Sequence, residues 1–396
     1  MGSRNMLLGS SRTTFDAISR PTGLQFSRCF SWTASRDAKH RPIKFHYTNP
    51  ELHEILKTIR EKIIIPSYLS EDQKKKVYDY RCQKELEIDP IVVDVDGEEF
   101  KFGYINPRQD VPNTKKLVQQ AVDHMKTKSD ISNVAPLLEG LKQAKRSVDS
   151  TILPKIVRRA GLADATSKIV DAAGWVERTN FRLIHSETVN MLLCFIQEKA
   201  LDSEWDKEET LKALKQANKV IEVMEERKEN HPDGMSWNEG MTLRKKPLYR
   251  DPQVLAARLH LAAVLAVKHY DGKDVDGLVT KYAQEVVALW PKDVGLLGLH
   301  PERAYQTKQD MAYLVRKEGL KFAWYAAPIL HGFKLAALVV EPELKQALLT
   351  RAEKLEAEIK QTKPRFESVE VYRKLFDANI GPTEEAEPVK EEEDSN

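Results

Sequence analysis

Apolar residues recur every three or four positions from residue 113 almost to the end of the chain, which is the spacing of one face of an α-helix. The pattern predicts a mainly α protein, built as an irregular array of antiparallel helix pairs. Helices are expected at 114–127, 133–146, 152–160, 163–178, 184–200, 207–229, 252–270, 275–290, 307–326, 329–340, 342–362 and 367–378.

The segment 31–112 adds further helices and the one convincing β pattern. Ser70 and Gln73 fit a capping box, which predicts a helix from there to about Glu87. Residues 91–105 then alternate apolar and polar positions around an Asp-Gly pair, whose positive φ angles suit a type I′ hairpin turn. Because two strands alone are marginally stable in water, we expect the hairpin to pack on neighbouring helices or on a partner.

One helix pair carries a more specific pattern. Residues 252–270 present a face of small residues, and a short polar break leads to a second helix that ends before Pro291. Alternating small and large residues on paired helices of this length resembles a tetratricopeptide repeat. The match covers one unit of about 40 residues and lacks the Trp-Leu-Gly of the first helix, so the chain resembles the tetratricopeptide and pentatricopeptide proteins in architecture alone. The resemblance implies a helical-repeat scaffold.

The N-terminus has the composition of a mitochondrial transit peptide. Residues 1–30 hold four arginines, one acid and no lysine, and their apolar positions share one side of a helical wheel. Arg28, Phe30 and Ser31 then resemble the arginine-directed processing site of matrix proteins, which implies a mature chain that begins near Phe30 or Ser31. The alternative is a disordered N-terminal arm. We expect a protein of the mitochondrial matrix.

Four parts of the chain follow from these patterns. They are a transit peptide at 1–30, an N-terminal helical segment with the hairpin at 31–112, a helical repeat-like domain at 113–380, and a disordered acidic tail at 381–396. Without residues 1–30 the basic and acidic residues nearly balance. The overall charge therefore gives no strong indication of nucleic-acid binding.

Residues 322–340 form an apolar run of nineteen residues that is barely long enough to span a membrane. Lys334 lies near its middle, where a charge costs about 2.5–3.5 kcal/mol on insertion. We therefore expect no transmembrane span here. A buried helix pair, broken at Pro328 or Gly332, is predicted instead.

No catalytic motif stands out. The chain contains neither a phosphate-binding glycine loop nor a nucleophile elbow, and its three cysteines include no CxxC pair. The ten histidines are scattered; His185, His260 and His331 lie in partly apolar helical surroundings, where core or groove positions are expected. We expect a non-catalytic protein without cofactor or metal, with an enzyme site assembled from distant positions as the remaining alternative.

Positive charge gathers in two places. Lys155, Arg158 and Arg159 share one helix face, within a segment 142–182 that holds nine basic and four acidic residues. A second cluster lies in the long polar loop 230–251. Basic faces can neutralise phosphates, whereas a solvated helix face is the alternative. The candidate RNA- or partner-binding residues are Lys155, Arg158, Arg159, Lys168, Arg244, Lys245, Lys246 and Arg250.

Two classes of function fit these features. The favoured class is a mitochondrial ribosomal protein or ribosome-associated translation factor that contacts ribosomal RNA and ribosomal proteins. The other class is an assembly factor or chaperone that binds a subunit of a respiratory complex on its helical surface. The transit peptide and the basic clusters favour the first class.

Overall fold

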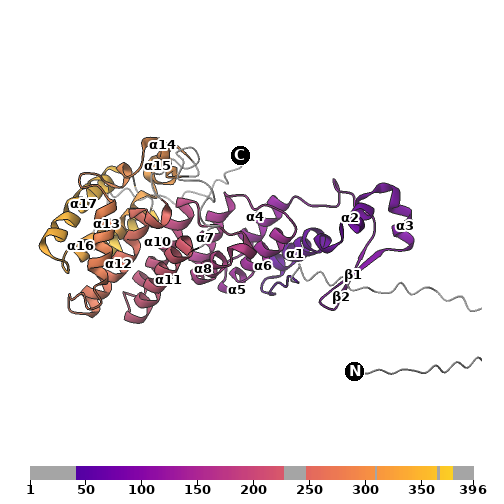
Figure 1. The fold of residues 1–396 in the computed structure, drawn as a ribbon, viewed down its shortest axis with the longest axis horizontal. Coiled ribbons are helices and arrows are strands. Elements are labelled where there is room, and N and C mark those ends of the chain that lie inside the picture. Colours follow the sequence, from indigo (N-terminus) through magenta and orange to yellow (C-terminus); the bar gives the residue numbers. More distant parts are fainter. Residues whose placement is uncertain (1–41, 227–246, 308–309, 364–365, 378–396) are drawn as a thin grey trace, which may run out of the picture. The chain divides into compact units, whose positions relative to one another are not determined.

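The computed structural model describes residues 42–226, 247–307, 310–363 and 366–377 (Figure 1). It is mainly helical, with one antiparallel hairpin, and the expected fold class is confirmed. The expected transit peptide at 1–30 and the acidic tail at 381–396 lie outside the described residues.

The first helices are short. The described chain begins with α1 (Pro50–Ile59), the π-helical turn η1 (Arg60–Ile64), the 3₁₀ turn η2 (Ile65–Tyr68), α2 (Glu71–Tyr78), the 3₁₀ turn η3 (Tyr80–Cys82) and α3 (Gln83–Ile88). Ser70 and Gln73 form the expected capping box at the start of α2. The single helix expected to reach about Glu87 is wrong, however, because Asp79 is extended and divides it. The carbonyl of Val77 accepts a hydrogen bond from the amide of Ile105 at 2.9 Å, so the returning chain occupies a group that a longer helix would need.

The hairpin forms as the sequence predicts. Strand β1 (Ile91–Val95) pairs antiparallel with β2 (Glu98–Phe102) across an Asp-Gly turn in which both residues have positive φ. The inner face of the hairpin belongs to a small hydrophobic cluster with Ile65, Leu69 and Val77. The expected packing of the hairpin on neighbouring helices is therefore present.

Helices then follow one another almost without interruption. They are α4 (Thr114–His124), α5 (Lys128–Ile131), α6 (Val134–Gln143), α7 (Ile152–Leu162), α8 (Thr166–Gly174), α9 (Val176–Thr179), α10 (Ser186–Asp202), α11 (Lys207–Glu226), η5 (Leu248–Arg250), α12 (Pro252–His269), α13 (Leu278–Leu289), η6 (Leu296–Gly298), α14 (Glu302–Gln306), α15 (Ala312–Gly319), α16 (Phe322–Ala336), α17 (Pro342–Gln361) and α18 (Phe366–Phe376). Many of them pack on the next long helix along the chain, as helix pairs do: α10 on α11, α11 on α12, α12 on α13, and α16 on α17.

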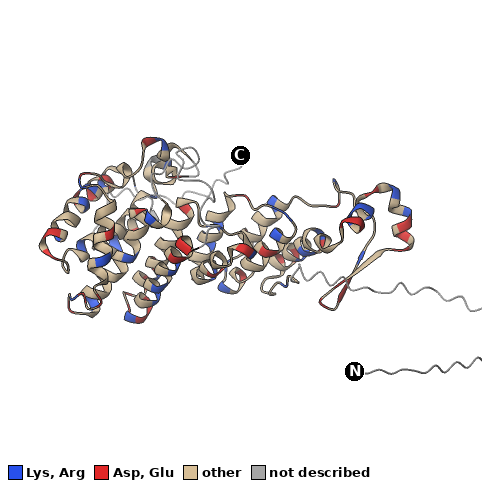
Figure 2. Ribbon diagram, in the orientation of Figure 1, with Lys and Arg blue, Asp and Glu red and all other residues tan. Residues whose placement is uncertain are grey.

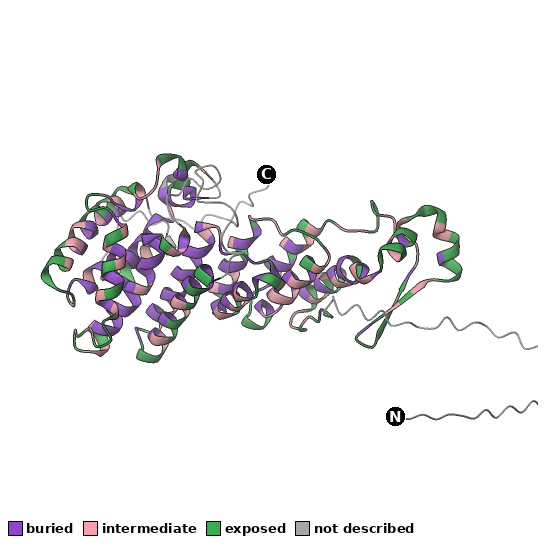
Figure 3. Ribbon diagram, in the orientation of Figure 1, coloured by how far each residue is buried: buried purple, intermediate pink, exposed green. Residues whose placement is uncertain are grey.

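Helix α12 lies at the centre of the C-terminal packing. It is buried almost all round and contacts α10, α11, α13 and α16. Its partner α13 returns after the short connection 270–277, so the predicted helical unit at 252–291 is present. One hydrophobic core extends from Ile43 to Leu375 through these helices (Figure 3).

The break expected within residues 322–340 is absent. Helix α16 continues through both Pro328 and Gly332. Pro328 lacks the N–H that would bond to the carbonyl oxygen of Trp324, and the thiol of Cys194 lies 3.9 Å from that oxygen as a substitute donor. The Nζ of Lys334 donates a hydrogen bond to the carboxylate of Glu356 at 2.8 Å. Among the described residues, none of the helices has both the length and the apolarity to cross a membrane.

Candidate nucleic-acid interface

Helix α7 separates a buried apolar stripe from a basic outer face. Its buried residues pack mainly on α10, and the two helices lie so close that a Cβ at Gly161 would meet the ring of Phe195. This packing directs Lys155 and Arg159, one turn apart, to the outside. Arg158 is half-buried, and its charge opposes the rise in pKa that burial causes at Tyr325 of α16.

The carboxylates of the segment 142–182 are mostly neutralised by lysines from outside it. Asp149 pairs with Lys115 at 2.6 Å, and Asp164 and Asp171 each lie 2.8 Å from a lysine Nζ, those of Lys199 and Lys219. The hydrogen bond from Lys115, with others from Thr151, lowers the pKa of Asp149 to about 2. Three of the four acids are thus occupied, which leaves the basic residues of the segment with fewer counter-charges than the sequence suggests.

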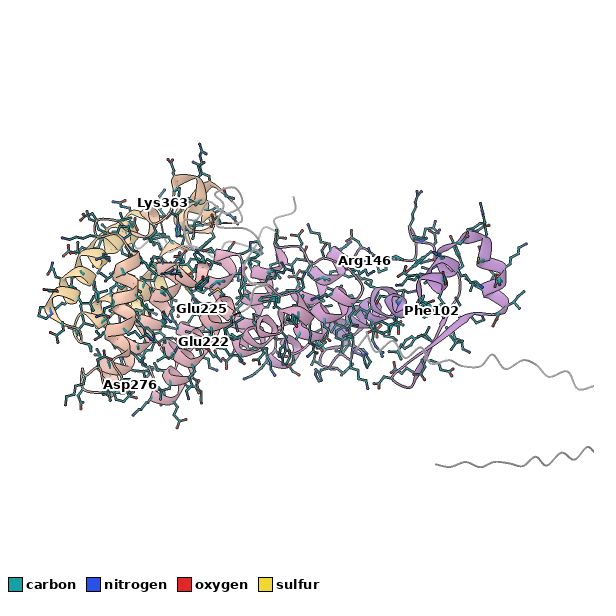
Figure 4. The ribbon with its side chains drawn as sticks, viewed as in Figure 1. Phe102, Arg146, Glu222, Glu225, Asp276 and Lys363 are labelled. Atoms are coloured by element: carbon teal, nitrogen blue, oxygen red, sulfur yellow. The ribbon has the colours of Figure 1, made fainter. Side chains whose placement is uncertain are left out.

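Several of these basic residues have no carboxylate partner among the described residues. Lys145, Arg146, Lys155, Lys168 and Arg182 form this group. Lysine and arginine are blue in Figure 2, and Arg146, which follows the end of α6, is labelled in Figure 4. Cations without carboxylate partners are suited to binding a polyanion.

Two other arginines lie near carboxylates of neighbouring helices, at different distances. Arg159 lies 3.8 Å from Asp123 on α4, a separation at which an exposed pair contributes little. Arg178 makes two hydrogen bonds to Glu139 on α6, at 3.3 and 2.6 Å. The guanidinium of Arg178 is therefore held in place, whereas that of Arg159 is available for a stronger anion.

Lys168 lies on α8 and lines an open depression of about 480 Å³. The half-exposed indole of Trp175 lines the same depression. Sequence reasoning did not single out Trp175, because one aromatic residue between two helices belongs to no periodic pattern. Its position inside the basic segment was the available signal.

The second basic cluster is described only in part. Arg244, Lys245 and Lys246 lie outside the described residues, as do Arg28, Phe30 and Ser31 of the expected processing site. Arg250 is exposed at the end of η5, next to Asp251, which caps α12. The turn η5 packs on α11 and α12, whereas α7 packs on α4, α5, α8 and α10.

His260 and His331 pack against each other inside the helical array. His260 is buried on α12, and its Nε2 lies 2.9 Å from Nδ1 of His331 on α16. Burial lowers the pKa of His331 to about 4 and that of His260 well below its usual range. In the parts of the chain that the structure describes, no three His, Cys, Asp or Glu side chains are grouped as a metal site would require.

Comparison with known proteins shows similarity to one family and to a curated relative. The family described as "Mitochondrial ribosomal protein mS27" matches residues 28–379. The small ribosomal subunit protein mS27 of Neurospora crassa is 34% identical over 386 residues, which cover 93% of this chain and 96% of that relative.

Proposed function

The chain belongs to the mitochondrial ribosomal protein mS27 family, and from this premise we propose that it is a non-catalytic component of the small mitochondrial ribosomal subunit in the matrix. Family membership confirms the expectation of a mitochondrial ribosomal protein. It lends no support to the alternative of a respiratory-complex assembly factor. The Arg-rich, acid-poor N-terminus supports the matrix as the compartment.

We further propose that the outer face of α7 and its neighbours contacts ribosomal RNA. The observation that carries this proposal is the pairing of Asp149, Asp164 and Asp171 with lysines from other segments. Lys145, Arg146, Lys155 and Lys168 have no carboxylate partner among the described residues. Such cations bind phosphates and release counter-ions, which makes the association sensitive to salt.

The contact is expected to position the protein and not to read sequence. Lysine and arginine on a helix surface bind phosphate oxygens, which carry no base identity. A duplex of A-form RNA is recognised mainly through its backbone and 2′-hydroxyls. The remaining helical surface is then available for neighbouring ribosomal proteins.

A paired charge reversal tests the RNA contact. The double variant Lys155→Glu, Arg159→Glu is expressed in mitochondria and followed on density gradients as salt is raised from about 50 to about 200 mM. We expect the variant to leave the small subunit at lower salt than the wild type. The matched control reverses Lys345 and Lys354, two exposed lysines of α17 without a carboxylate partner among the described residues. Equal salt sensitivity of both double variants and the wild type would refute the contact at α7.

A further inference from the structure

Trp175 is a large apolar side chain held at the surface by a rigid backbone. Its side chain is 52% exposed at the junction of α8 and α9. The amide of Trp175 donates to the carbonyl oxygens of Asp171 and Ala172, and its own carbonyl accepts from Arg178 and Thr179. The exposed indole therefore projects from a fixed point.

One side of the indole is already occupied by a cation. The guanidinium of Arg178 lies 5.2 Å from the ring centroid, and the two hydrogen bonds to Glu139 hold it there. The indole N–H has no hydrogen-bond partner among the described residues. A tryptophan with an open face and a free donor is typical of binding surfaces.

The depression beside Trp175 is lined by several separate elements. It is lined by residues of α5, α6 and α8 and by His46, and its volume of about 480 Å³ is in the range of ligand-binding clefts. The buried amide of Asn133 accepts from the backbone N–H of His46 at 2.7 Å and donates to its carbonyl at 3.1 Å. These two hydrogen bonds between the side chain of Asn133 and the main chain of His46 hold the segment before α1 against the junction of α5 and α6.

The charge of the depression favours an anion. Its one carboxylate, Asp171, is paired with Lys219 at 2.8 Å. Lys168, also in the lining, has no carboxylate partner among the described residues. The hydroxyls of Ser129 and Ser132 add polar groups that can donate or accept hydrogen bonds.

We propose that this depression holds one unpaired nucleotide of RNA, with its base stacked on Trp175 and its phosphate paired with Lys168. The proposal rests on the proposed function, since the nucleotide would belong to ribosomal RNA. Aromatic stacking tolerates every base, and unstacked nucleotides are the usual targets of such side chains. A protein segment fits less well. Among the described residues, the charge without a partner in the lining is the positive charge of Lys168, and an exposed indole beside a lysine suits a base and its phosphate.

The test uses the full-length protein and a fluorescently labelled twelve-nucleotide oligouridylate, with binding measured by anisotropy. Stacking on one aromatic residue contributes about 1–3 kcal/mol, so Trp175→Ala should weaken binding at least about fivefold. Trp175→Phe should keep most of the affinity, whereas Trp175→Leu, which keeps an apolar surface but no ring, should lose it. The matched control is Tyr80→Ala, which removes a 72% exposed aromatic residue beside the hairpin and should bind as the wild type does.

Lys168→Gln tests the phosphate contact independently of the indole. Removing one phosphate contact on a single strand should reduce the magnitude of the salt slope of log K by about 0.7. This variant carries the test should Trp175→Ala fail to fold, since Lys168 is an exposed side chain.

The outcomes separate this proposal from the proposed function. Suppose that Trp175→Ala and Lys168→Gln bind the oligonucleotide as the wild type does, while the double variant Lys155→Glu, Arg159→Glu dissociates from the small subunit. The depression is then not the nucleotide site, and the RNA contact at α7 stands. If no protein binds the oligonucleotide, yet Trp175→Ala alone is lost from the subunit, the occupant is a protein segment and the proposal is wrong. Loss of oligonucleotide binding in Trp175→Ala and Trp175→Leu, with Trp175→Phe retained, would support it.

Discussion

Gly332 of α16 lies directly against the backbone of His260 on α12. A Cβ placed on Gly332 would lie 2.8 Å from both the Cα and the Cβ of His260, closer than carbon atoms pack. The contact therefore depends on the absence of a side chain at position 332. It allows the two most extensively packed helices of the C-terminal part to cross closely.

Replacement of Gly332 by Ala should destabilise the protein by about 1–3 kcal/mol, because the added methyl group forces α16 away from the main chain of α12. The better helix propensity of alanine offsets about 1 kcal/mol of the larger strain. Urea denaturation measures the change. Gly174→Ala is the matched control, since a Cβ at that helical position meets no atom within 4 Å, and it should leave stability unchanged or slightly raised. Equal midpoints for the two variants would show that the helices do not cross as described.

Because His260 and His331 are hydrogen-bonded to each other and both are buried or half-buried, we expect the folded protein to lose stability in mild acid. Gln197 donates through Nε2 to the carbonyl of Leu193, so its Oε1 is the atom that faces Nδ1 of His260. Because an amide oxygen only accepts hydrogen bonds, Nδ1 of His260 carries the proton and donates it to Oε1. Nε2 of His260 then accepts from Nδ1–H of His331 at 2.9 Å. Burial, with nearby Lys268 and Lys334, lowers the pKa of His331 to about 4. The unfolded histidine binds its proton near pH 6.5, so stability is present above that pH and falls as the pH drops from about 6.5 to about 4.

His331→Asn keeps a donor near Nδ1 but cannot take up a proton. We expect the wild type to lose up to about 3 kcal/mol over this pH range through His331, and the variant to lose less. Thermal melts at several pH values make the comparison, with His46→Asn, at an exposed histidine before α1, as the control. A variant as acid-sensitive as the wild type would show that the pair does not control the response.

The side chain of Arg351 on α17 caps the C-terminal end of α13 with hydrogen bonds. Arg351 is buried, at 5% exposed, and its guanidinium donates to the carbonyl oxygens of Trp290 and Val287, and to that of Ala347 in its own helix. The partial negative charge of the α13 terminus compensates the buried cation.

Arg351→Met should cost about 2–4 kcal/mol, since it leaves buried carbonyls without donors. Arg351→Lys should cost less, because the charge remains while the planar fork of donors is lost. Denaturation midpoints of the two variants give the order. If the Arg351→Met variant proves as stable as the wild type, these hydrogen bonds do not hold α13 and α17 together.

The two described cysteines should differ in reactivity. Burial raises the pKa of Cys194 well above its usual range, whereas Cys82 is half-buried. In a Cys29→Ser background, a maleimide should label Cys82 in the native protein and Cys194 only after denaturation. Mass spectrometry of the labelled peptides locates the modification. Rapid native labelling of Cys194 would contradict its burial on α10 against the carbonyl of Trp324.

Local patterns in the sequence were sufficient to predict the hairpin, the capping box at Ser70 and the run of paired helices. Each depends on residues close together in the chain. Two expectations failed where a distant group intervened. The amide of Ile105 bonds to the carbonyl of Val77 where α2 ends. The thiol of Cys194 lies 3.9 Å from the carbonyl oxygen that Pro328 leaves without a backbone donor, and α16 continues past it. Neither contact has a signal within the affected segment.

The sequence likewise predicted only part of the candidate interface. The spacing of Lys155 and Arg159 placed them on one helix face, where the structure has them exposed and half-buried. The lysines that neutralise Asp149, Asp164 and Asp171 lie about 35 to 50 residues away along the chain, so the true charge of the surface emerges only in the fold. The depression beside Trp175 is built from four separate segments and has no sequence pattern.

The most direct test of the central claim is sedimentation of the endogenous protein from detergent-solubilised mitochondria. Gradients are run with magnesium and after its chelation, and fractions are probed for this chain and for small-subunit ribosomal RNA. The account predicts that the chain follows this RNA into the small-subunit peak in both gradients, at moderate salt, and moves to light fractions after nuclease treatment. A chain that stays in light fractions before nuclease, or that follows an inner-membrane complex, would contradict it.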